Sequence, residues 1–427
     1  MSYIYYSATT NIEIFFKNVE INKKMIYRIP LFAIIITFVA FICCSSPQAD
    51  TEIRLVLTGQ ALIKKDPRLR WEDPFCTLRP ILDSADIAFT NFEMAVISEE
   101  DLCGLPPDYE VSFGSPDLPK GDRPGNTGEP HAVAPEVMNF LADLGFNLMS
   151  LSNNHSWDLG DCGVLATIKA AEENDVSHAG TGLDIFKATA PAYLTVGDFT
   201  IALVAATTSL DERSAILPNV NGVWTGRQDD WDRNITAVCE AAANADFVLY
   251  YHHFQIDIDD FNGMSPGDTT RDGHIWIDDL TRWQSEFAYA LLDAGASIYI
   301  GNGDRAFDGI EIYNGKPLIR QIGGLAYQGL RPNIGAYDKH HPWEGLIAEA
   351  IISKDRIVKL EFMPLDLDEG ETYRSDFDDL EFLSRRGLAQ LATGEQAQSI
   401  LQHFSELSTK YGTEMEITGT RAKVKIE

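Results

Sequence analysis

Residues 150–163 read SLSNNHSWDLGDCG and lie between an apolar segment typical of a strand and the start of a predicted helix. Four polar side chains fall within six positions of this stretch: Asn153, Asn154, His155 and Asp158. At the carboxyl end of a strand such side chains point out of the sheet edge, where α/β proteins bind ligands, and amide and imidazole groups are competent metal donors. Asparagine and aspartate are also frequent in turns, so the alternative is an Asn-rich turn that caps a helix beginning near Gly163.

The sequence before this stretch predicts a helix and then a strand. Pro135 opens the helix and Gly145 closes it. The apolar residues between them recur at helical spacing: Val137, Phe140, Leu141 and Leu144. Residues 146–151 then read as a buried strand that leads into the polar stretch. Strands and helices continue to alternate between residues 54 and 322, which predicts an α/β fold.

The NNH-x-x-D-x-G-x-x-G core of this block resembles the CapA family of capsule-synthesis proteins, which also includes poly-γ-glutamate synthesis proteins and belongs to the metallophosphoesterase-like superfamily. The resemblance rests on several spaced motifs between residues 53 and 427. It implies a metallophosphoesterase-like sandwich of two packed mixed β-sheets flanked by α-helices. We accordingly predict an N-terminal extension with a signal segment over residues 1–50, a CapA-like domain over 51–365, and an acidic linker with a helical tail over 366–427.

Composition and charge limit the classes of function. A chain of 427 residues can bury one large core or two ordinary ones. The formal net charge of -30 argues against a nucleic-acid partner, which requires a basic face. We interpret the excess of acidic residues as solvated surface.

The N-terminal residues predict export. Residues 31–42, LFAIIITFVAFI, form an apolar run of signal-peptide length that follows Arg28 and precedes Cys43 and Cys44. This arrangement resembles a bacterial lipoprotein signal, with one of the two cysteines as the acylation site. We therefore expect an exported protein of the cell envelope that is attached to a membrane by a lipid anchor. The alternative is an uncleaved signal anchor, and Met25 is an alternative start.

Four cysteines lie beyond that segment: Cys76, Cys103, Cys162 and Cys239. In an oxidising compartment they can pair in three ways, and their spacing does not choose among them. No C-x-x-C pair occurs, which argues against a thiolate zinc site. Buried free thiols remain the alternative for Cys162 and Cys239.

Further candidate ligands follow other predicted strands. The strand over 54–58 ends in Gly59-Gln60, and the strand over 86–90 leads to Glu93. The strand over 246–253 ends in His252 and His253. Because adjacent side chains of a strand point to opposite faces, only one of these histidines is expected at the site. We favour His253, because by count from Asp246 it falls where the resemblance to the CapA family implies a metal-ligating histidine. Two more histidines are open candidates, each with an ordinary structural alternative at a helix entry or a glycine-bearing turn: His131 and His178.

The resemblance implies metal ligands at several of these positions, and three of them are replaced. Gln60 stands where the family pattern has an aspartate, and Asn302 and Arg305 stand where it has histidines. The pattern is kept at Glu93, Asn154, His155 and His253. Because amides are weak metal ligands and Arg305 is a permanent cation, we expect at most one divalent ion, of manganese, iron or zinc, or none if the site is degenerate.

Two functions follow as hypotheses. The first is an exported CapA-like protein linked to capsule or poly-γ-glutamate synthesis, with a partly degenerate site that binds an acidic extracellular polymer or the machinery that makes it. The second is an active mononuclear phosphoesterase, in which Glu93, Asn154 and His253 hold the metal. In that case His155, beside Asp158, protonates the leaving group, and Arg305 pairs with phosphate oxygens.

Overall fold

The computed structural model describes residues 52–69, 71–98, 100, 102–105, 131–209, 219–224, 228–254, 277–303, 306–328, 343–354, 356–367 and 387–426. Arg305 and the predicted signal segment lie outside these ranges. Residues Thr51–Glu427 form one compact unit. Within the described residues, no helix is both long and apolar enough to cross a membrane.

The first of two large sheets has ten strands among the described residues. Eight of them lie in the order β18 (Met415–Thr418), β19 (Arg421–Val424), β16 (Ile357–Asp366), β15 (Glu344–Ile352), β1 (Ile53–Leu62), β2 (Ile87–Phe92), β5 (Leu148–Ser150) and β6 (Ser177–Ala179). In addition, β14 (Gly324–Tyr327) pairs with β1, and β17 (Gln390–Leu391) pairs with β16. Strands β1, β2, β5 and β6 run parallel, so their carboxyl ends share one edge.

The second sheet has seven strands among the described residues. Its order is β12 (Ile310–Tyr313), β13 (Lys316–Ile319), β11 (Ile298–Asn302), β10 (Phe247–Phe254), β8 (Phe199–Ser209) and β7 (Ala192–Val196), with β9 (Gly222–Trp224) beside β8. Strands β8, β10, β11 and β13 run parallel. A short parallel ribbon joins β3 (Ala95–Val96) to β4 (Ala132–Val133).

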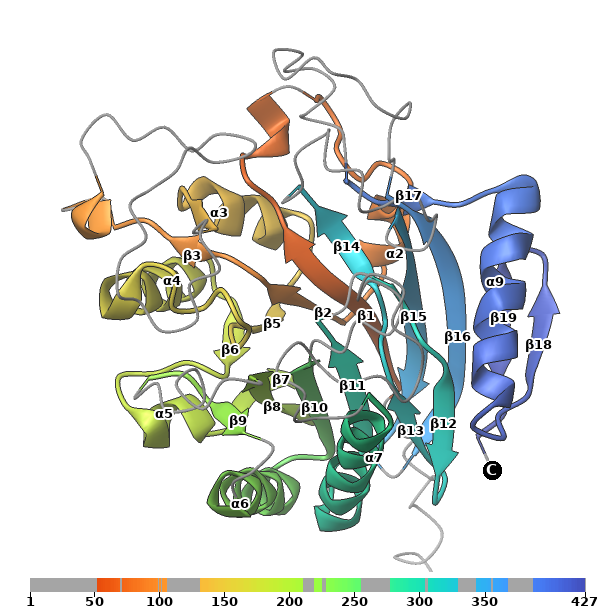
Figure 1. Cartoon of the computed structure of the whole chain (residues 1–427). Coiled ribbons are helices and arrows are strands. Elements are labelled where there is room, and N and C mark those ends of the chain that lie inside the picture. The colour runs from red at the N-terminus through yellow and green to blue at the C-terminus, as the bar shows by residue number, and fades with distance from the viewer. Residues whose placement is uncertain are drawn as a thin grey trace, which may run out of the picture. The chain divides into compact units, whose positions relative to one another are not determined.

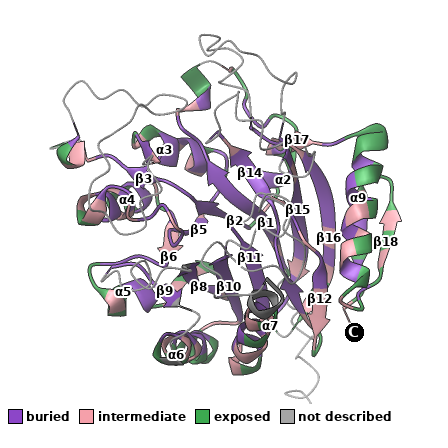
Figure 2. Cartoon of the chain, in the orientation of Figure 1, coloured by how far each residue is buried: buried purple, intermediate pink, exposed green. Residues whose placement is uncertain are grey.

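Helices cover the outer faces of both sheets (Figure 1). Helices α2 (Arg79–Leu82), α3 (Glu136–Asp143) and α4 (Gly160–Glu173) pack on the first sheet, whereas α6 (Gln228–Asn244) and α7 (Ile277–Ala294) pack on the second. Helix α9 (Gly394–Thr409) packs Phe404 against Phe362 of β16. The remaining short helices are η1 (Pro67–Leu69), η2 (Leu102–Gly104) and α5 (Ile185–Thr189). Figure 2 shows both sheets buried and the helices exposed on their outer faces.

The period of two along each strand determines which side chains lie between the sheets. On β10, Leu249 and Tyr251 belong to the core between the two sheets, whereas Val248 and Tyr250 belong to the core beneath α6 and α7. A side chain that continues the first row therefore reaches the space between the sheets at the strand end. The predicted fold class is confirmed: the chain is an α/β sandwich of two mixed sheets flanked by helices.

Local predictions agree with the structure to within a few residues. Asn314 and Gly315 form the turn that joins β12 and β13, and both residues have positive φ, as the tight turn of a hairpin requires. Helix α4 begins at Gly160, earlier than predicted, because the turn that holds Asp158 leads directly into it. Strand β1 continues past Gln60 to Leu62 because it pairs there with β14.

Candidate functional site

Glu93 and His253 lie at the carboxyl ends of strands that belong to different sheets. Glu93 directly follows β2, and His253 is the next to last residue of β10. Their side chains face each other, with 3.9 Å between Oε1 of Glu93 and Nε2 of His253. Both residues are almost fully buried, at 2% and 0% exposed. Two positions that lie far apart in the sequence thus form one polar site between the sheets.

The two histidines of β10 point to opposite faces, as the alternation predicts. His253 continues the row of Leu249 and Tyr251 toward the space between the sheets. Among the described residues neither of its ring nitrogens has a hydrogen-bond partner. Burial, followed by the charges of His155 and His252, lowers its pKa well below the ordinary value. His253 is therefore a neutral imidazole that can bind a ligand at either nitrogen.

His155 and Asp158 form a hydrogen-bonded pair. Nδ1 of His155 lies 2.8 Å from Oδ2 of Asp158, and the same oxygen accepts a bond of 2.6 Å from the backbone N–H of His131. Burial alone would lower the pKa of His155, but the charge and hydrogen bond of Asp158, together with Glu93, outweigh it and raise that pKa. The pair can therefore hold a proton on His155 and deliver it from Nε2.

The two asparagines of the opening motif have different roles. Asn153 builds the turn, because its Oδ1 accepts from the backbone N–H of His155 at 2.9 Å and its Nδ2 donates to the carbonyl of Phe92 at 2.8 Å. Oδ1 of Asn154 is buried and has no hydrogen-bond partner within the described residues. The turn interpretation thus fits Asn153, and the donor interpretation fits Asn154.

His131 lies at the site, although its sequence position left this open. Its ring stacks on that of His155, with 3.6 Å between centroids. Burial first, then His155 and Lys64, lower the pKa of His131 well below its ordinary value. The other open candidate, His178, lies on the edge strand β6 opposite Met149.

Lys64 is a site residue that sequence reasoning missed. It follows β1 by two positions, at the edge that also carries Gln60 and Glu93, and only 2% of it is exposed. The signal was available in the sequence, because a lysine directly after an apolar strand that ends at the site is placed to reach it. Lysine is rarely buried to this extent without a specific reason.

Of the three positions at which the resemblance implies a replaced ligand, two lie among the described residues: Gln60 and Asn302. Nδ2 of Asn302 donates to the carbonyl of Gly323 at 2.8 Å, and its Oδ1 accepts from Tyr251 at 3.3 Å, so this amide is held in place by its neighbours. Oε1 of Gln60 is buried without a hydrogen-bond partner among the described residues. Arg305 lies outside the described residues.

The described side chains do not supply the full donor set of a two-metal centre. In the part of the chain that the structure describes, no three histidine, cysteine, aspartate or glutamate side chains come together as a metal site. Glu93 and His253 supply one anionic and one imidazole donor, and Asn154 adds an amide oxygen. Amide oxygens bind metals more weakly than carboxylates, so these three described donors would suit a single divalent ion.

A disulfide bond joins Cys103 to Cys162 near the His155–Asp158 pair. Cys162 lies in the first turn of α4, and Cys103 lies in η2. The bond borders a small apolar cluster to which Leu159 and Ala132 contribute, next to Asp158 and His131 respectively. Cys162 is therefore not a free thiol, whereas Cys239 is free and exposed rather than buried.

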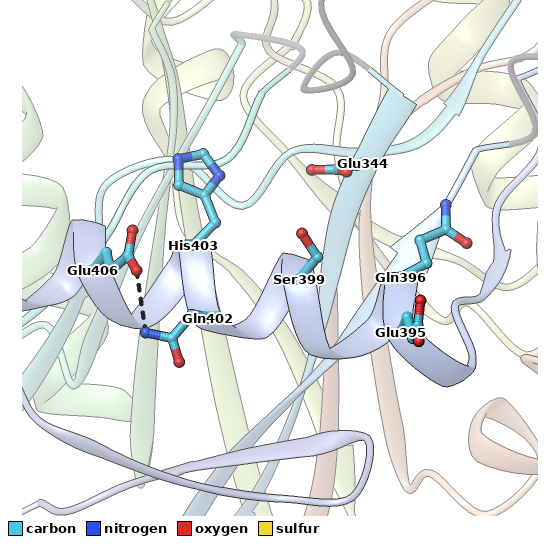
Figure 3. Close-up of a pocket in the computed structure, with 7 residues that line it drawn as sticks. All are labelled: Glu344, Glu395, Gln396, Ser399, Gln402, His403 and Glu406. Carbon is cyan, nitrogen blue, oxygen red and sulfur yellow. Dashed lines mark hydrogen bonds between the residues drawn. The ribbon is translucent and has the colours of Figure 1, made fainter.

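A separate pocket of about 720 Å³ lies along α9 (Figure 3). Six of its seven lining residues come from α9, and the seventh is Glu344 of β15. None of the predicted site residues lines it, and Figure 1 shows α9 on the other side of the first sheet from α4. The chemistry of the sequence motifs therefore belongs to the site between the sheets and not to this pocket.

Comparisons with known proteins agree with this architecture. The family described as bacterial capsule synthesis protein PGA_cap matches residues 54–326. The uncharacterized protein y4sH of Sinorhizobium fredii is 24% identical, with 85% of this chain and 91% of that protein covered. The PGA biosynthesis protein CapA of Bacillus subtilis is 25% identical, with 55% and 54% covered. The capsule biosynthesis protein CapA of Bacillus anthracis is 22% identical, with 59% and 53% covered.

The family match begins at Arg54 in β1 and ends at Ala326 in β14, so it spans the strands that carry Gln60, Glu93, His253 and Asn302 and the turn that carries His155 and Asp158. It covers well over half of the chain and includes every described residue of the site. The chain therefore belongs to the CapA family of bacterial capsule synthesis proteins.

Proposed function

We propose that this chain acts at the cell envelope, after export, in the synthesis of a capsule or of an acidic polymer such as poly-γ-glutamate. Relatives whose names refer to capsule and poly-γ-glutamate synthesis support a role in the synthesis of such a polymer. The Cys103–Cys162 disulfide supports export, because such bonds persist in oxidising compartments. The apolar run at residues 31–42 and the cysteines after it support an attachment to the membrane by a lipid or signal anchor.

One observation carries our proposal for the site. Glu93 and His253 face each other beside the His155–Asp158 pair, and Gln60 and Asn302 stand where the resemblance implies ligands of a second metal. Such a site keeps the groups that bind an acidic ligand and move a proton, but it lacks the donors for two cations. We therefore assign it to recognition of an acidic polymer or a precursor of that polymer, as a partly degenerate metallophosphoesterase-like site.

A second candidate function is hydrolysis of a phosphoester with a single divalent ion. The raised pKa of His155, which its pairing with Asp158 produces, favours this candidate because a general acid must hold its proton at neutral pH. Glu93, Asn154 and His253 would hold the ion. When bound, the ion would supply Lewis-acid stabilisation of a phosphoryl oxygen.

Deletion of the gene in a polymer-producing host tests the proposed function. We expect polymer yield to fall and to recover with the parent chain, but not with the His155→Ala, His253→Ala double variant. His403→Ala, on α9, is the matched control and should restore yield fully. Unchanged yield in the deletion strain would contradict the assignment to polymer synthesis.

Metal analysis of the purified chain separates the two candidates. About one equivalent of manganese, iron or zinc in the parent, lost in His253→Ala but kept in His403→Ala, would support the single-ion hydrolase. Absence of metal after incubation with all three ions would restrict the site to binding.

A further inference from the structure

Directly paired polar residues form a row at the carboxyl ends of the strands in each sheet. In the second sheet, Thr207 of β8 and Asn302 of β11 both pair with His253 of β10. In the first sheet, Gln60 of β1 pairs with Asn91 of β2. Paired residues of neighbouring strands lie roughly 4.8 Å apart and place their side chains on the same face of the sheet. Each row therefore presents several polar groups side by side.

The hydroxyl of Thr207 reaches the space between the sheets. Every second residue of β8 over 199–205 belongs to the core between the sheets, and Thr207 is the next member of that series. Thr208 points to the other face, where it contacts His252 under α7. Thr207 therefore lies beside His253 on the face that carries the site.

Asn91 and His253 face each other across the same space. Two residues earlier on their strands, the rings of Phe89 and Tyr251 lie against each other, with 5.3 Å between centroids. Both rings belong to the core between the sheets. Because side chains of a strand repeat their direction every two residues, Asn91 and His253 extend this facing pair toward the strand ends.

Four of these side chains carry polar atoms that the described residues leave unpaired. The buried atoms without a hydrogen-bond partner in the described part of the chain are Oε1 of Gln60, Nδ2 of Asn91, Oγ1 of Thr207 and both ring nitrogens of His253. Each of the four residues is at most 4% exposed. Buried polar groups in native structures are nearly always hydrogen-bonded, so a cluster of this kind calls for a bound partner.

The chemistry of these atoms requires a partner that both donates and accepts hydrogen bonds. Oε1 of Gln60 can only accept, and Nδ2 of Asn91 can only donate. A hydroxyl and a neutral imidazole can do both, and burial keeps His253 neutral because it lowers the pKa well below the ordinary value. An ionised carboxylate or phosphate brings no donor and would leave the oxygen of Gln60 unsatisfied.

A secondary amide meets this requirement. It carries one N–H and one C=O, and in the planar trans form the two point in opposite directions. Such a group between the facing rows can donate to one row and accept from the other. A sugar hydroxyl also donates and accepts, but from a single atom, so it suits two facing rows less well.

We propose that Thr207 and Asn91, together with Gln60 and His253, bind an amide group of the ligand, and that Thr207 is a specificity-determining residue of the site. This inference rests on the proposed function, since it names the group that the same site recognises. In an acidic polymer such as poly-γ-glutamate, amide linkages join successive units, and the acidic groups lie beside them. The rows then recognise the linkage of the polymer rather than its charge.

Calorimetric titration of the full purified chain with γ-glutamylglutamate tests the proposal, after metals are removed with a chelator and the chelator is removed. This dipeptide carries an amide linkage and free carboxylates. The comparison probes are glutarate, which has carboxylates without an amide, inorganic phosphate, and glucose, which has hydroxyls. We expect the dipeptide to bind with one-to-one stoichiometry and about tenfold or more tightly than each comparison probe.

Replacement of Thr207 tests its hydroxyl directly. Thr207→Val removes the hydroxyl and keeps the branched shape, and it should weaken binding of the dipeptide about tenfold. Thr207→Ser keeps the hydroxyl and should bind within about threefold of the parent. Thr200→Val is the matched control, because it is the same replacement near the start of β8, where the hydroxyl lies 3.1 Å from that of Thr195. It should bind as the parent does.

Urea unfolding of Thr207→Val separates a ligand-binding role from a structural one. A buried hydroxyl without a partner costs stability, so its removal should leave the urea midpoint at or above that of the parent. A lowered midpoint would show that the hydroxyl is structural and would overturn the proposal.

The binding results can overturn the proposal in three further ways. These are equal binding of the dipeptide by the parent and Thr207→Val, tighter binding of a comparison probe than of the dipeptide, and binding of no probe. The last result would assign the unpaired atoms to buried water.

The outcome is independent of the polymer assay. Loss of polymer in the deletion strain with equal binding by the parent and Thr207→Val would contradict the role of Thr207 and leave the proposed function intact. Normal polymer in the deletion strain with weakened binding in Thr207→Val would contradict the function and leave the amide site intact.

Discussion

At the carboxyl end of β10, one buried histidine lies on each face of the strand, and the two differ in their hydrogen bonds. His252 lies under α7, where Thr208 contacts its Nε2 and the hydroxyl of Tyr299 lies 2.5 Å from its Nδ1. Aromatic rings surround it, among them Phe254, with 5.2 Å between ring centroids. His253, one residue on, lies between the sheets and has no hydrogen-bond partner among the described residues. Among the described residues, the hydrogen bonds of His252 are therefore satisfied and those of His253 are not.

This difference shows that buried polar residues fall into two groups, according to whether their hydrogen bonds are satisfied within the fold. A satisfied group contributes to stability, because each of its hydrogen bonds replaces one to water and its ring fills space in the core. An unsatisfied group costs stability, so its presence in the core calls for another reason, such as a ligand, ion or water that it binds. The predictions below test this contrast between the region under α7 and the region between the sheets.

The largest effect is expected from removal of the Cys103–Cys162 disulfide. The two cysteines are 59 residues apart in sequence, and the chain-entropy estimate for a loop of that size is about 4 kcal/mol of unfolding free energy. Urea unfolding of a Cys103→Ser, Cys162→Ser double variant measures it. We also expect faster hydrogen exchange at His131 and no change under α7. A loss below about 1 kcal/mol would show that the bond does not stabilise the region between the sheets.

The next effect separates the two histidines directly. His252→Ala removes a packed ring and two hydrogen bonds and should lower the free energy of unfolding by about 3 kcal/mol. His253→Ala removes no hydrogen bond to a described residue and should cost about 1 kcal/mol or less. Urea unfolding of both variants measures the difference. Equal losses of unfolding free energy in the two variants would contradict the distinction between a structural and a ligand-binding histidine.

Replacement of Asp158 by asparagine tests whether Asp158 is what raises the pKa of His155. Asp158→Asn removes the charge that outweighs burial at His155, so the pKa of His155 should fall below its ordinary value. Nuclear magnetic resonance titration of the ring protons measures it, with the pKa of His403 as an internal reference far from the change. A pKa of His155 that stays raised would show that Glu93, and not Asp158, is the main cause.

The pH dependence of stability follows from the same contrast. Burial lowers the pKa of His252 from 6.5 to about 3. Between these two values the unfolded chain binds a proton at His252 that the folded chain does not bind. The contribution of neutral His252 to the free energy of unfolding is therefore complete above pH 6.5 and is lost as pH falls toward 3, by about 1.4 kcal/mol for each pH unit. Unfolding free energies measured from pH 7 to pH 4 should show a shallower decline in His252→Phe than in the parent. Equal slopes would contradict the assignment of a neutral His252.

The sequence predicted the fold well because its signals are local and regular. The unbroken apolar run over residues 247–251 predicts a buried strand, and the period of two along it places His252 and His253 on opposite faces. The choice of His253 for the site came from the resemblance to the CapA pattern. The turn at Asn314-Gly315 is determined by its two residues. These features depend on periodicity and turn chemistry, which a single sequence contains.

The site was predicted less completely because its partners are distant in the chain. The stacking of His131 on His155 depends on the pairing of β3 with β4, and the burial of Lys64 depends on the contact of its backbone with Gln328. The choice of Cys103 as partner of Cys162 likewise depends on where η2 and α4 meet. No local pattern carries these long-range contacts.

Histidine-selective nuclear magnetic resonance of the full chain tests the central claim that the strand ends between the sheets form the ligand site. Signals of His131, His155 and His253, assigned with single variants, are followed as inorganic phosphate, glutarate or zinc is added, and His252 serves as the reference one residue away. The account predicts that at least one ligand shifts all three site signals and leaves that of His252 in place. Shifts confined to His252 or to the α9 residue His403, or no shift at any histidine, would contradict it.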